Sequence, residues 1–432
     1  MATPLGRPIS FLPGDIAALI HDEVVAQHVE EAAFLWTLRH RAADDAHYRL
    51  DDLAALDRRV EAHLSGLRAA GDVGWNMCRT ALEDAGPGQV FAMGVLAFDA
   101  GDRRRMHDAL LAACASPGLR CGLVAALGWL PYARIAPWLQ LLLASKASEH
   151  RWIGISAAAA HRHDPGRVLP DALEADDAFV RARALRAAGE LKRVDLAAQI
   201  HAHLRDEDPA ARFWAAWSAV LLLRDRAAVE ALKQATEAAD AFSIPALQLV
   251  LRVMPAADAK AWIRTLTTRS EQPRLTISAT GTFGDPAAVP WLIEQMKRPE
   301  LARLAGEAFS QITGADLAYL DLDQDPPAPL AQAVPGDDGL VPLDNDTNLP
   351  WPDPFKVVRW WKRNRAGFSA GSRYLCGQAV HPSTLATVLL KGRQRQRAAA
   401  ALEWACTGPA QAFVEIRERG DRQKQRLSQW IS

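Results

Sequence analysis

Residues 180–191 read VRARALRAAGEL, and a related pattern returns along the chain at nearly constant spacing. The pattern is marked by five arginines: Arg151, Arg181, Arg212, Arg274 and Arg303. Successive marker arginines are separated by 30, 31, 62 and 29 residues, so the gap of 62 covers two periods. A period of about 30 residues accommodates two short helices and two turns. The sequence therefore predicts a helical-repeat protein.

A second repeated feature lies downstream of the first four marker arginines. It consists of four aspartates with spacings of 31, 30 and 60 residues: Asp164, Asp195, Asp225 and Asp285. Alanine-rich segments precede these aspartates and leucine-rich segments follow them. Asp164 and Asp285 stand directly before proline, which is typical of a helix N-cap followed by the first helical residue. Two independent features thus carry the same period.

These periods predict an all-α fold, with an α-solenoid of about seven helix pairs at residues 102–314. Residues 1–101 lack the repeat spacing and are predicted to form a helical N-terminal cap, because an open solenoid end would expose apolar side chains. Residues 315–354 are predicted to be an acidic, proline-rich linker without a core. Residues 355–432 are predicted to form a small, basic helical module containing tryptophan.

Apolar residues at three- and four-residue steps predict individual helices outside the repeats. The predicted ranges are 22–43, 50–70, 356–365, 382–390 and 394–406. Within the repeats, residues 243–268 are predicted to form a helix pair that has lost its marker arginine.

The charge distribution is uneven although the formal net charge is -1. Residues 355–432 carry 15 Lys and Arg against 4 Asp and Glu, whereas residues 1–354 carry 35 against 47. Such a separation is typical of contact between the two parts, or of a basic surface for an acidic partner.

Three features indicate a cytoplasmic protein without membrane insertion. The five cysteines form no CxxC pair, which argues against a zinc knuckle or a disulfide framework. The first ten residues lack the apolar stretch of a secretory signal. The longest clean apolar run, at residues 213–223, is much shorter than the roughly 20 residues that cross a bilayer.

Two segments support a resemblance to a known repeat family. VRARALRAAGEL from Val180 and GDPAAVPWLIEQM from Gly284 resemble the short HEAT-like repeats that also occur in phycobilisome-lyase proteins. This resemblance implies an α-solenoid over about 200 residues and leaves the activity open, since such folds host unrelated functions.

Further segments resemble one bacterial family of HEAT-like-repeat proteins. They are VVAQHVEEAAFLWTLR from Val24, LPWPDP from Leu349, the pair Trp360-Trp361, RYLCG from Arg373 and GRQRQRAAAALEWA from Gly392. The genes of that family tend to lie in type VI secretion clusters beside spike and adaptor genes. The resemblance implies an accessory role in secretion and transfers no catalytic residue.

Catalytic motifs are weak in this sequence. HEAT-repeat hydroxylases bind di-iron through His-Glu dyads, and none of the twelve histidines here precedes a glutamate. Residues 367–371, GFSAG, match a nucleophile-elbow pattern but follow a predicted basic helix instead of a strand. Asp321, Asp323 and Asp325 begin like a calcium loop, yet Pro326 occupies the position that requires glycine. We therefore predict no catalytic residue, metal site or cofactor.

The sequence favours a non-catalytic adaptor that binds another protein, such as a secretion spike, effector or adaptor. We expect the binding residues on the second helices of the repeats and in the basic module: Gln140, Glu174, Gln199, His203, Lys233, Glu294, Trp360, Trp361, Lys362, Arg363 and Arg365. Positive charge interleaved with tryptophan also suits nucleic acid, which is the alternative partner. A lyase-like or metal-dependent enzyme is the third and weakest alternative.

Two groups of arginines are expected to have no ligand. The periodic spacing of the marker arginines favours a structural role, in which they bridge neighbouring repeats through carboxylates or helix-end carbonyls. Arg393, Arg395 and Arg397 alternate with glutamine and are expected to form one solvated helix face.

Overall fold

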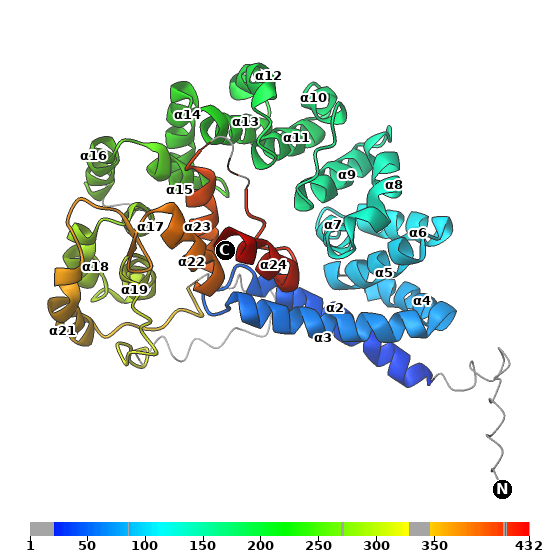
Figure 1. Ribbon diagram of the computed structural model, residues 1–432, viewed down its shortest axis with the longest axis horizontal. Helices are drawn as coiled ribbons and strands as arrows, with labels where there is room; N and C mark the ends of the chain where they lie inside the picture. Colours follow the sequence, from blue (N-terminus) through cyan, green and yellow to red (C-terminus); the bar gives the residue numbers. More distant parts are fainter. Residues whose placement is uncertain are drawn as a thin grey trace, which may run out of the picture. The chain divides into compact units, whose positions relative to one another are not determined.

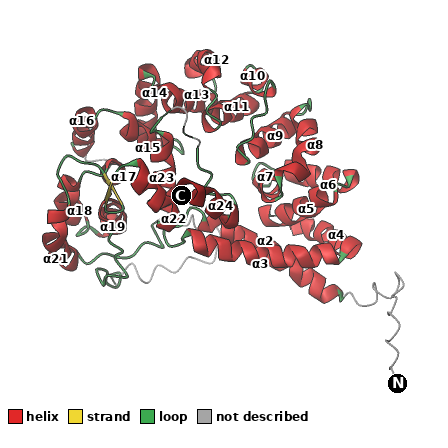
Figure 2. Ribbon diagram, viewed as in Figure 1, coloured by secondary structure: helices red, strands yellow, loops and turns green. Residues whose placement is uncertain are grey.

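The computed structural model describes residues 21–84, 86–268, 272–327, 346–408, 411 and 413–431. Almost all regular structure in these ranges is helical, with one two-stranded hairpin, which confirms the all-α prediction (Figure 2). None of the helices in the described ranges has the length and apolar character needed to span a membrane.

The described chain divides into two compact units. One combines the described part of residues 1–40 with residues 54–142, and the other combines residues 41–53 with the described part of residues 143–432. This division is based on contacts, and the four-part organisation expected from the sequence stays a prediction.

The first unit is built around a buried helix. Its helices are α2 (Asp22–Ala42), α3 (Leu50–Ala69), α4 (Gly71–Thr80), η1 (Ala81–Asp84), α5 (Pro87–Ala100), α6 (Arg103–Cys114), α7 (Arg120–Trp129) and α8 (Tyr132–Leu143). The ends of α2 and α3 extend into residues 41–53, and α8 ends at Leu143, one residue beyond the unit. The α5 side chains from Val90 to Phe98 are almost completely buried. Trp36 stacks on Phe91 with ring centroids 5.0 Å apart, so α2 and α5 share this core.

Six helices of the second unit pack in sequence against one another (Figure 1). We call them the row helices: α9 (Ser148–Ala160), α11 (Ala178–Glu190), α13 (Pro209–Leu223), α15 (Ser243–Val253), α17 (Pro273–Phe283) and α19 (Pro299–Thr313). They are rich in alanine and other small residues, which allows neighbouring helices to approach closely. Ala184, Ala187 and Ala188 of α11, for example, are completely buried.

A second helix follows each of the first five row helices. These helices and their short 3-10 extensions are α10 (Val168–Leu173), η2 (Val194–Leu196), α12 (Ala197–Ala202), η3 (His203–Arg205), α14 (Arg226–Glu237), α16 (Ala256–Thr267), η4 (Pro286–Ala288) and α18 (Val289–Gln295). Figure 1 shows them on the side of the row away from three C-terminal helices, α22 (Pro382–Lys391), α23 (Gln394–Ala405) and α24 (Gly420–Ile431). We call the opposite side, which faces these three helices, the inner side.

The C-terminal part of the second unit is also mostly helical. It contains α21 (Pro354–Asn364), η5 (Arg365–Gly367), β1 (Tyr374–Leu375), β2 (Gln378–Ala379), α22 (Pro382–Lys391), α23 (Gln394–Ala405) and α24 (Gly420–Ile431). The hairpin tip contacts the end of α19, where the Cys376 amide donates to the Gln311 carbonyl at 2.7 Å. A side chain added at Gly314 would come within 2.6 Å of the Cys376 carbonyl oxygen, so this contact requires glycine.

The predicted acidic linker buries apolar side chains at both of its ends. Leu317 and Leu322 near one end join Phe309 and Val357 in a hydrophobic core. Near the other end, Trp351 is 8% exposed. The expectation that residues 315–354 bury no core is therefore wrong for the described ends, while residues 328–345 lie outside the described residues.

Candidate partner-binding surfaces

The orientation of helix α21 is fixed by a cap at its N-terminus and by a buried side chain on one face. The Asp353 carboxylate accepts hydrogen bonds from the amides of Phe355 and Lys356, at 2.8 and 3.1 Å, and Pro354 occupies the first turn. Val357 is completely buried in the core beneath the helix. This cap and this buried side chain together determine which residues point outward.

The outward side of α21 combines an aromatic side chain with three cations. Phe355 is 80% exposed, and Arg359, Lys362 and Arg363 are also exposed. Steps of four, seven and eight residues from Phe355 place all four on one helix face, which we call the α21 face. Arg365, in the following turn, is exposed as well.

The cations of the α21 face have no ion-pair partner among the residues that the structure describes. By contrast, Lys356 lies on the same helix and binds Asp321 at 3.0 Å. Like charges that stay unpaired on adjacent turns repel one another, and a negatively charged partner relieves this repulsion. The exposed aromatic ring adds an apolar anchor of the kind that protein interfaces use.

The expected aromatic contribution of Trp360 and Trp361 differs from what the structure shows. Both indoles are half-buried and pack inward. The Trp360 ring is 5.6 Å from that of Phe309, and the Trp361 ring is 5.3 Å from that of Phe368. Phe355 supplies the exposed ring instead, and the Asp353-Pro354 cap could have indicated this helix orientation from the sequence.

The expectation that Arg393, Arg395 and Arg397 form a solvated helix face is wrong. The Arg397 guanidinium is completely buried and donates to the Leu389 carbonyl and to the Gln394 side chain, at 2.6 and 2.8 Å. Arg395 pairs with Glu307 at 2.9 Å. The alternation with glutamine thus reflects interior hydrogen bonds, because each arginine has a partner from another segment or turn.

Two marker arginines connect neighbouring helix pairs. Arg181 binds the Asp206 carboxylate through two nitrogen atoms, at 2.9 and 3.0 Å, and also donates to the Ala175 carbonyl at 2.8 Å. Arg212 donates to the Asp206 carbonyl at 2.6 Å. The same short segment before α13 therefore accepts from two successive markers.

The other marker arginines have individual surroundings. Arg274 binds Asp346 at 2.6 Å, and the guanidinium of Arg303 lies 5.2 Å from the Trp351 ring. A hydrogen bond from Ser148 and the charge of Arg151 are among the causes that lower the pKa of Asp177.

The four aspartates that repeat with the marker arginines stabilise turns and helix starts. Asp225 and Asp285 cap the next helical segment by accepting from backbone amides at 2.9 and 3.0 Å. Asp164 accepts from the Gly166 amide and, with Asp195, from Arg193. These contacts occur at turns and helix starts, where carboxylates satisfy free N–H groups.

Three predicted partner-binding residues of the second helices lie together. The Gln199 amide donates to Glu174 at 3.3 Å, and the Nε2 atom of His203 lies 3.9 Å from the same carboxylate. The remaining three are separate, with Gln140 exposed on α8 in the first unit, Lys233 paired with Glu230, and Glu294 paired with Lys297.

The inner side of the row carries a set of cations that sequence reasoning missed. Arg162, Lys192 and Arg224 follow the ends of α9, α11 and α13, and each has a left-handed backbone with φ of 54°, 57° and 54°. Spacings of 30 and 32 residues could have revealed them, but left-handed positions usually hold glycine.

Two of these cations bind backbone carbonyls at the C-terminal end of α23. Lys192 donates to the Ala405 carbonyl and Arg224 to the Cys406 carbonyl, each at 2.8 Å. Burial lowers the pKa of the Lys192 ammonium to about 8. Backbone carbonyls are thus the ligands of the half-buried Lys192 and of the exposed Arg224.

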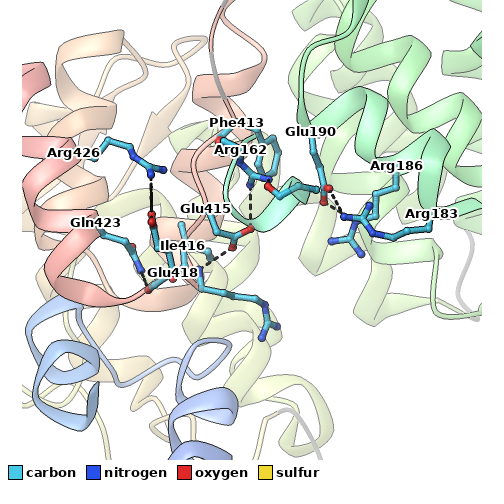
Figure 3. Close-up of polar contacts among 12 residues, drawn as sticks. Arg162, Arg183, Arg186, Glu190, Phe413, Glu415, Ile416, Glu418, Gln423 and Arg426 are labelled. Atoms are coloured by element: carbon cyan, nitrogen blue, oxygen red, sulfur yellow. Dashed lines mark hydrogen bonds and ion pairs between the residues drawn. The ribbon is translucent and has the colours of Figure 1, made fainter. Parts of the chain in front are cut away.

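Arg162 continues this set of contacts (Figure 3). It donates to the Phe413 carbonyl at 2.9 Å and pairs with Glu415 at 3.1 Å. Its guanidinium also lies 5.3 Å from the Phe413 ring. The inner side of the row therefore binds non-helical backbone through charge-assisted hydrogen bonds.

A buried carboxylate balances the cations near Arg162. Glu190 accepts from Arg183 at 2.9 Å and from Arg186 at 2.8 Å (Figure 3). Burial by itself raises the pKa of Glu190, but the three nearby guanidinium groups outweigh this effect and lower the pKa to about 2. Glu190 therefore stays charged across the physiological pH range.

The candidate catalytic motifs lack the surroundings that they require. The 3-10 helix η5 precedes Ser369 where a nucleophile elbow needs a strand, and the Ser369 amide donates to the Tyr374 hydroxyl at 3.0 Å. Asp321 pairs with Lys356. In the described part of the chain, His, Cys, Asp and Glu side chains form no group of three or more suited to a metal ion.

Comparison with known sequences adds no assignment, because no family model and no curated protein matches this chain.

Proposed function

We propose that this chain is an α-solenoid of about seven HEAT-like helix pairs, capped by N-terminal helices, that binds another protein without catalysis. The serial packing of the row helices, and the second helix that follows each of the first five, support this architecture. Repeats of this kind provide long surfaces suited to protein partners.

We infer the binding function from the α21 face. Three exposed cations without described partners surround an exposed phenylalanine on a helix whose opposite side is anchored in a core. A partner that fits this face has an acidic surface with an apolar recess for the Phe355 ring. Complementary charge accelerates association, and the buried ring contributes most to affinity.

The partner that we propose is a component of a type VI secretion system, namely a spike, an effector or an adaptor. This assignment rests on the sequence resemblance given above. The chain would act as an accessory factor that loads or assembles the secreted complex. Nucleic acid is the competing partner, because unpaired cations beside an aromatic ring also suit phosphate and base.

A charge-reversal variant tests the proposal. We expect R359E/K362E/R363E to reduce recovery of the secretion component from native extract at least tenfold relative to the wild-type chain. The matched control is R167E/R226E/R264E, which makes the same charge change at three exposed, scattered positions. This control should retain the partner.

Three results would overturn the proposal. The first is recovery of no secretion component by the wild-type chain, and the second is equal recovery by the α21 variant. The third is binding of DNA at physiological salt that the α21 variant loses and the control keeps, because this would assign the face to nucleic acid.

A further inference from the structure

The inner side of the second unit contains a large groove away from the three inner cations. Its walls come from row helices α15, α17 and α19 and from α23, and its volume is about 920 Å³. No described part of the chain fills this space. Ligand-binding clefts in proteins commonly have volumes of about 300–1,000 Å³. We call this space the inner groove.

The inner groove contains polar side chains with unused hydrogen-bonding capacity. The buried Oε1 atom of Gln272 has no hydrogen-bond partner. The side chains of Gln248, Ser278 and Gln311 also line the groove, and none of them makes a hydrogen bond to the described part of the chain. For the buried Oε1 atom of Gln272 the missing partner costs free energy, which a ligand recovers by supplying one. Gln248 is exposed, and Ser278 and Gln311 are half-buried, so these three are accessible to a ligand.

The three glutamines are suited to a peptide backbone. A side-chain amide both donates and accepts, so it can pair with the N–H and C=O groups of one peptide unit. Gln248 lies on α15, Gln272 precedes α17 and Gln311 lies on α19. Packed helices are separated by about 8–10 Å, which corresponds to about three residues of an extended chain. Successive row helices thus present one amide for about every three ligand residues.

The other half of the inner side already binds backbone in this way. Along α9, α11 and α13, the inner cations bind carbonyl groups at the C-terminal end of α23 and in the segment after it. The inner groove continues along the same side of the same row. Its amides replace the cations as the groups that contact backbone.

Carboxylates at the groove define the preferred side chains of the ligand. Five carboxylates and two arginines line the groove. Four of the carboxylates pair with an arginine in or beside the groove: Asp346 with Arg274, Glu307 with Arg395, Asp44 with Arg417 and Glu300 with Arg298. Asp240 has no ion pair among the described residues, so a positive side chain from a ligand would pair with this carboxylate.

We propose that the inner groove binds an extended peptide segment of a partner protein, read through its backbone by Gln248, Gln272 and Gln311 and bearing at least one lysine or arginine. This site is separate from the α21 face and does not depend on the partner proposed there. Main-chain hydrogen bonds and charge attraction both contribute to the binding free energy of this complex.

A randomised ten-residue peptide library displayed on phage, selected against the immobilised full chain, tests this proposal. We expect enrichment of peptides with lysine or arginine. Single N-methylation of a selected synthetic peptide, at a backbone N–H that contacts an amide, should weaken binding at least tenfold. This readout separates backbone recognition from simple charge attraction.

Variants of the chain locate the site. Q248L and Q311L should each weaken binding of the selected peptide at least tenfold, and S278V should weaken it less. The matched control is Q234L, which changes an exposed glutamine of α14 outside the groove and should bind normally. Unchanged thermal unfolding of each variant shows that the fold is intact.

Three results would overturn the inference: no enrichment from the library, enrichment of acidic peptides, or binding that Q248L and Q311L leave unchanged. Binding that appears only after residues 328–345 are replaced by a glycine-serine chain would also overturn it, because the groove would then belong to that segment. Loss of peptide binding by R359E/K362E/R363E is not expected, so failure here and failure at the α21 face are distinguishable.

Discussion

Arg162 and Glu415 form an ion pair of 3.1 Å across 253 positions of sequence. The pair joins the end of a row helix to the segment between α23 and α24. Both side chains are largely buried, with 13% and 20% exposed, so the contact is more than a solvated surface pair. It indicates that the inner side of the row is a binding surface for non-helical chain.

The contacts of Arg162 predict local opening of the C-terminal segment. Replacing Phe413 with alanine removes the ring packed between Arg162 and Trp217. We expect faster amide hydrogen exchange at residues 413–416 and unchanged exchange in α11. R162A should have the same effect, and R167A, at an exposed position, should have none. Equal protection in F413A and wild type would contradict this assignment.

Glu190 predicts a pH-dependent contribution to stability. Its pKa is about 2 in the folded chain, below the ordinary value of 4.5, so the stabilisation is complete above pH 4.5 and is lost as the pH falls from 4.5 towards 2. E190Q leaves the buried Arg183 without its counter-charge and should lower the free energy of unfolding by about 3–5 kcal/mol at pH 7.

Denaturant unfolding at several pH values measures this effect. The difference between wild type and E190Q should shrink below pH 4.5. The exposed control E294Q should change stability by less than about 0.5 kcal/mol. A difference between wild type and E190Q that stays constant from pH 7 to pH 3 would show that the Glu190 charge is not the cause.

The bidentate pair of Arg181 and Asp206 predicts energetic coupling between successive helix pairs. A double-mutant cycle with R181A and D206A should give a coupling energy of about 1–3 kcal/mol, since both groups are mostly buried. The exposed pair of Lys297 and Glu294 should give about 0.5 kcal/mol or less. Equal coupling in the two cycles would argue against a structural role of the marker.

Cysteine labelling provides an independent test of burial. Burial raises the pKa of Cys78 and Cys376 to about 12 and that of Cys406 to about 11. Since the thiolate is the reactive form, these thiols should react slowly with a disulfide reagent at pH 8 in the native protein and rapidly in denaturant. Mass spectrometry of labelled peptides identifies each site. Fast native labelling of Cys376 would contradict burial of its thiol where the hairpin tip contacts α19.

The sequence predicted much of the helical organisation because apolar periodicity reports directly on buried helix faces. The helix predicted at 50–70 occupies residues 50–69, and the one predicted at 394–406 occupies residues 394–405. Helix α24 was missed because few of its residues are apolar. It packs through Leu427 and through Gln423, which is 2% exposed and accepts from Arg397.

The candidate surfaces were harder to predict because they depend on contacts between distant segments. A cluster of cations in α21 was visible in the sequence, but its exposed ring was assigned to tryptophan instead of Phe355. The partners of Arg162 and Lys192 lie more than 200 positions away, and periodicity contains no information on such pairs. The inner groove likewise requires side chains from several helices.

The function proposed for this chain depends on binding of an acidic protein partner to the α21 face. The most direct test introduces a photo-crosslinking amino acid at Phe355 in the native cell and, as a control, at the exposed Val194 of η2. We predict a cross-link from position 355 alone, to a secretion component, at a peptide rich in aspartate and glutamate. Cross-links of equal yield at both positions, or from position 355 to nucleic acid only, would contradict the account.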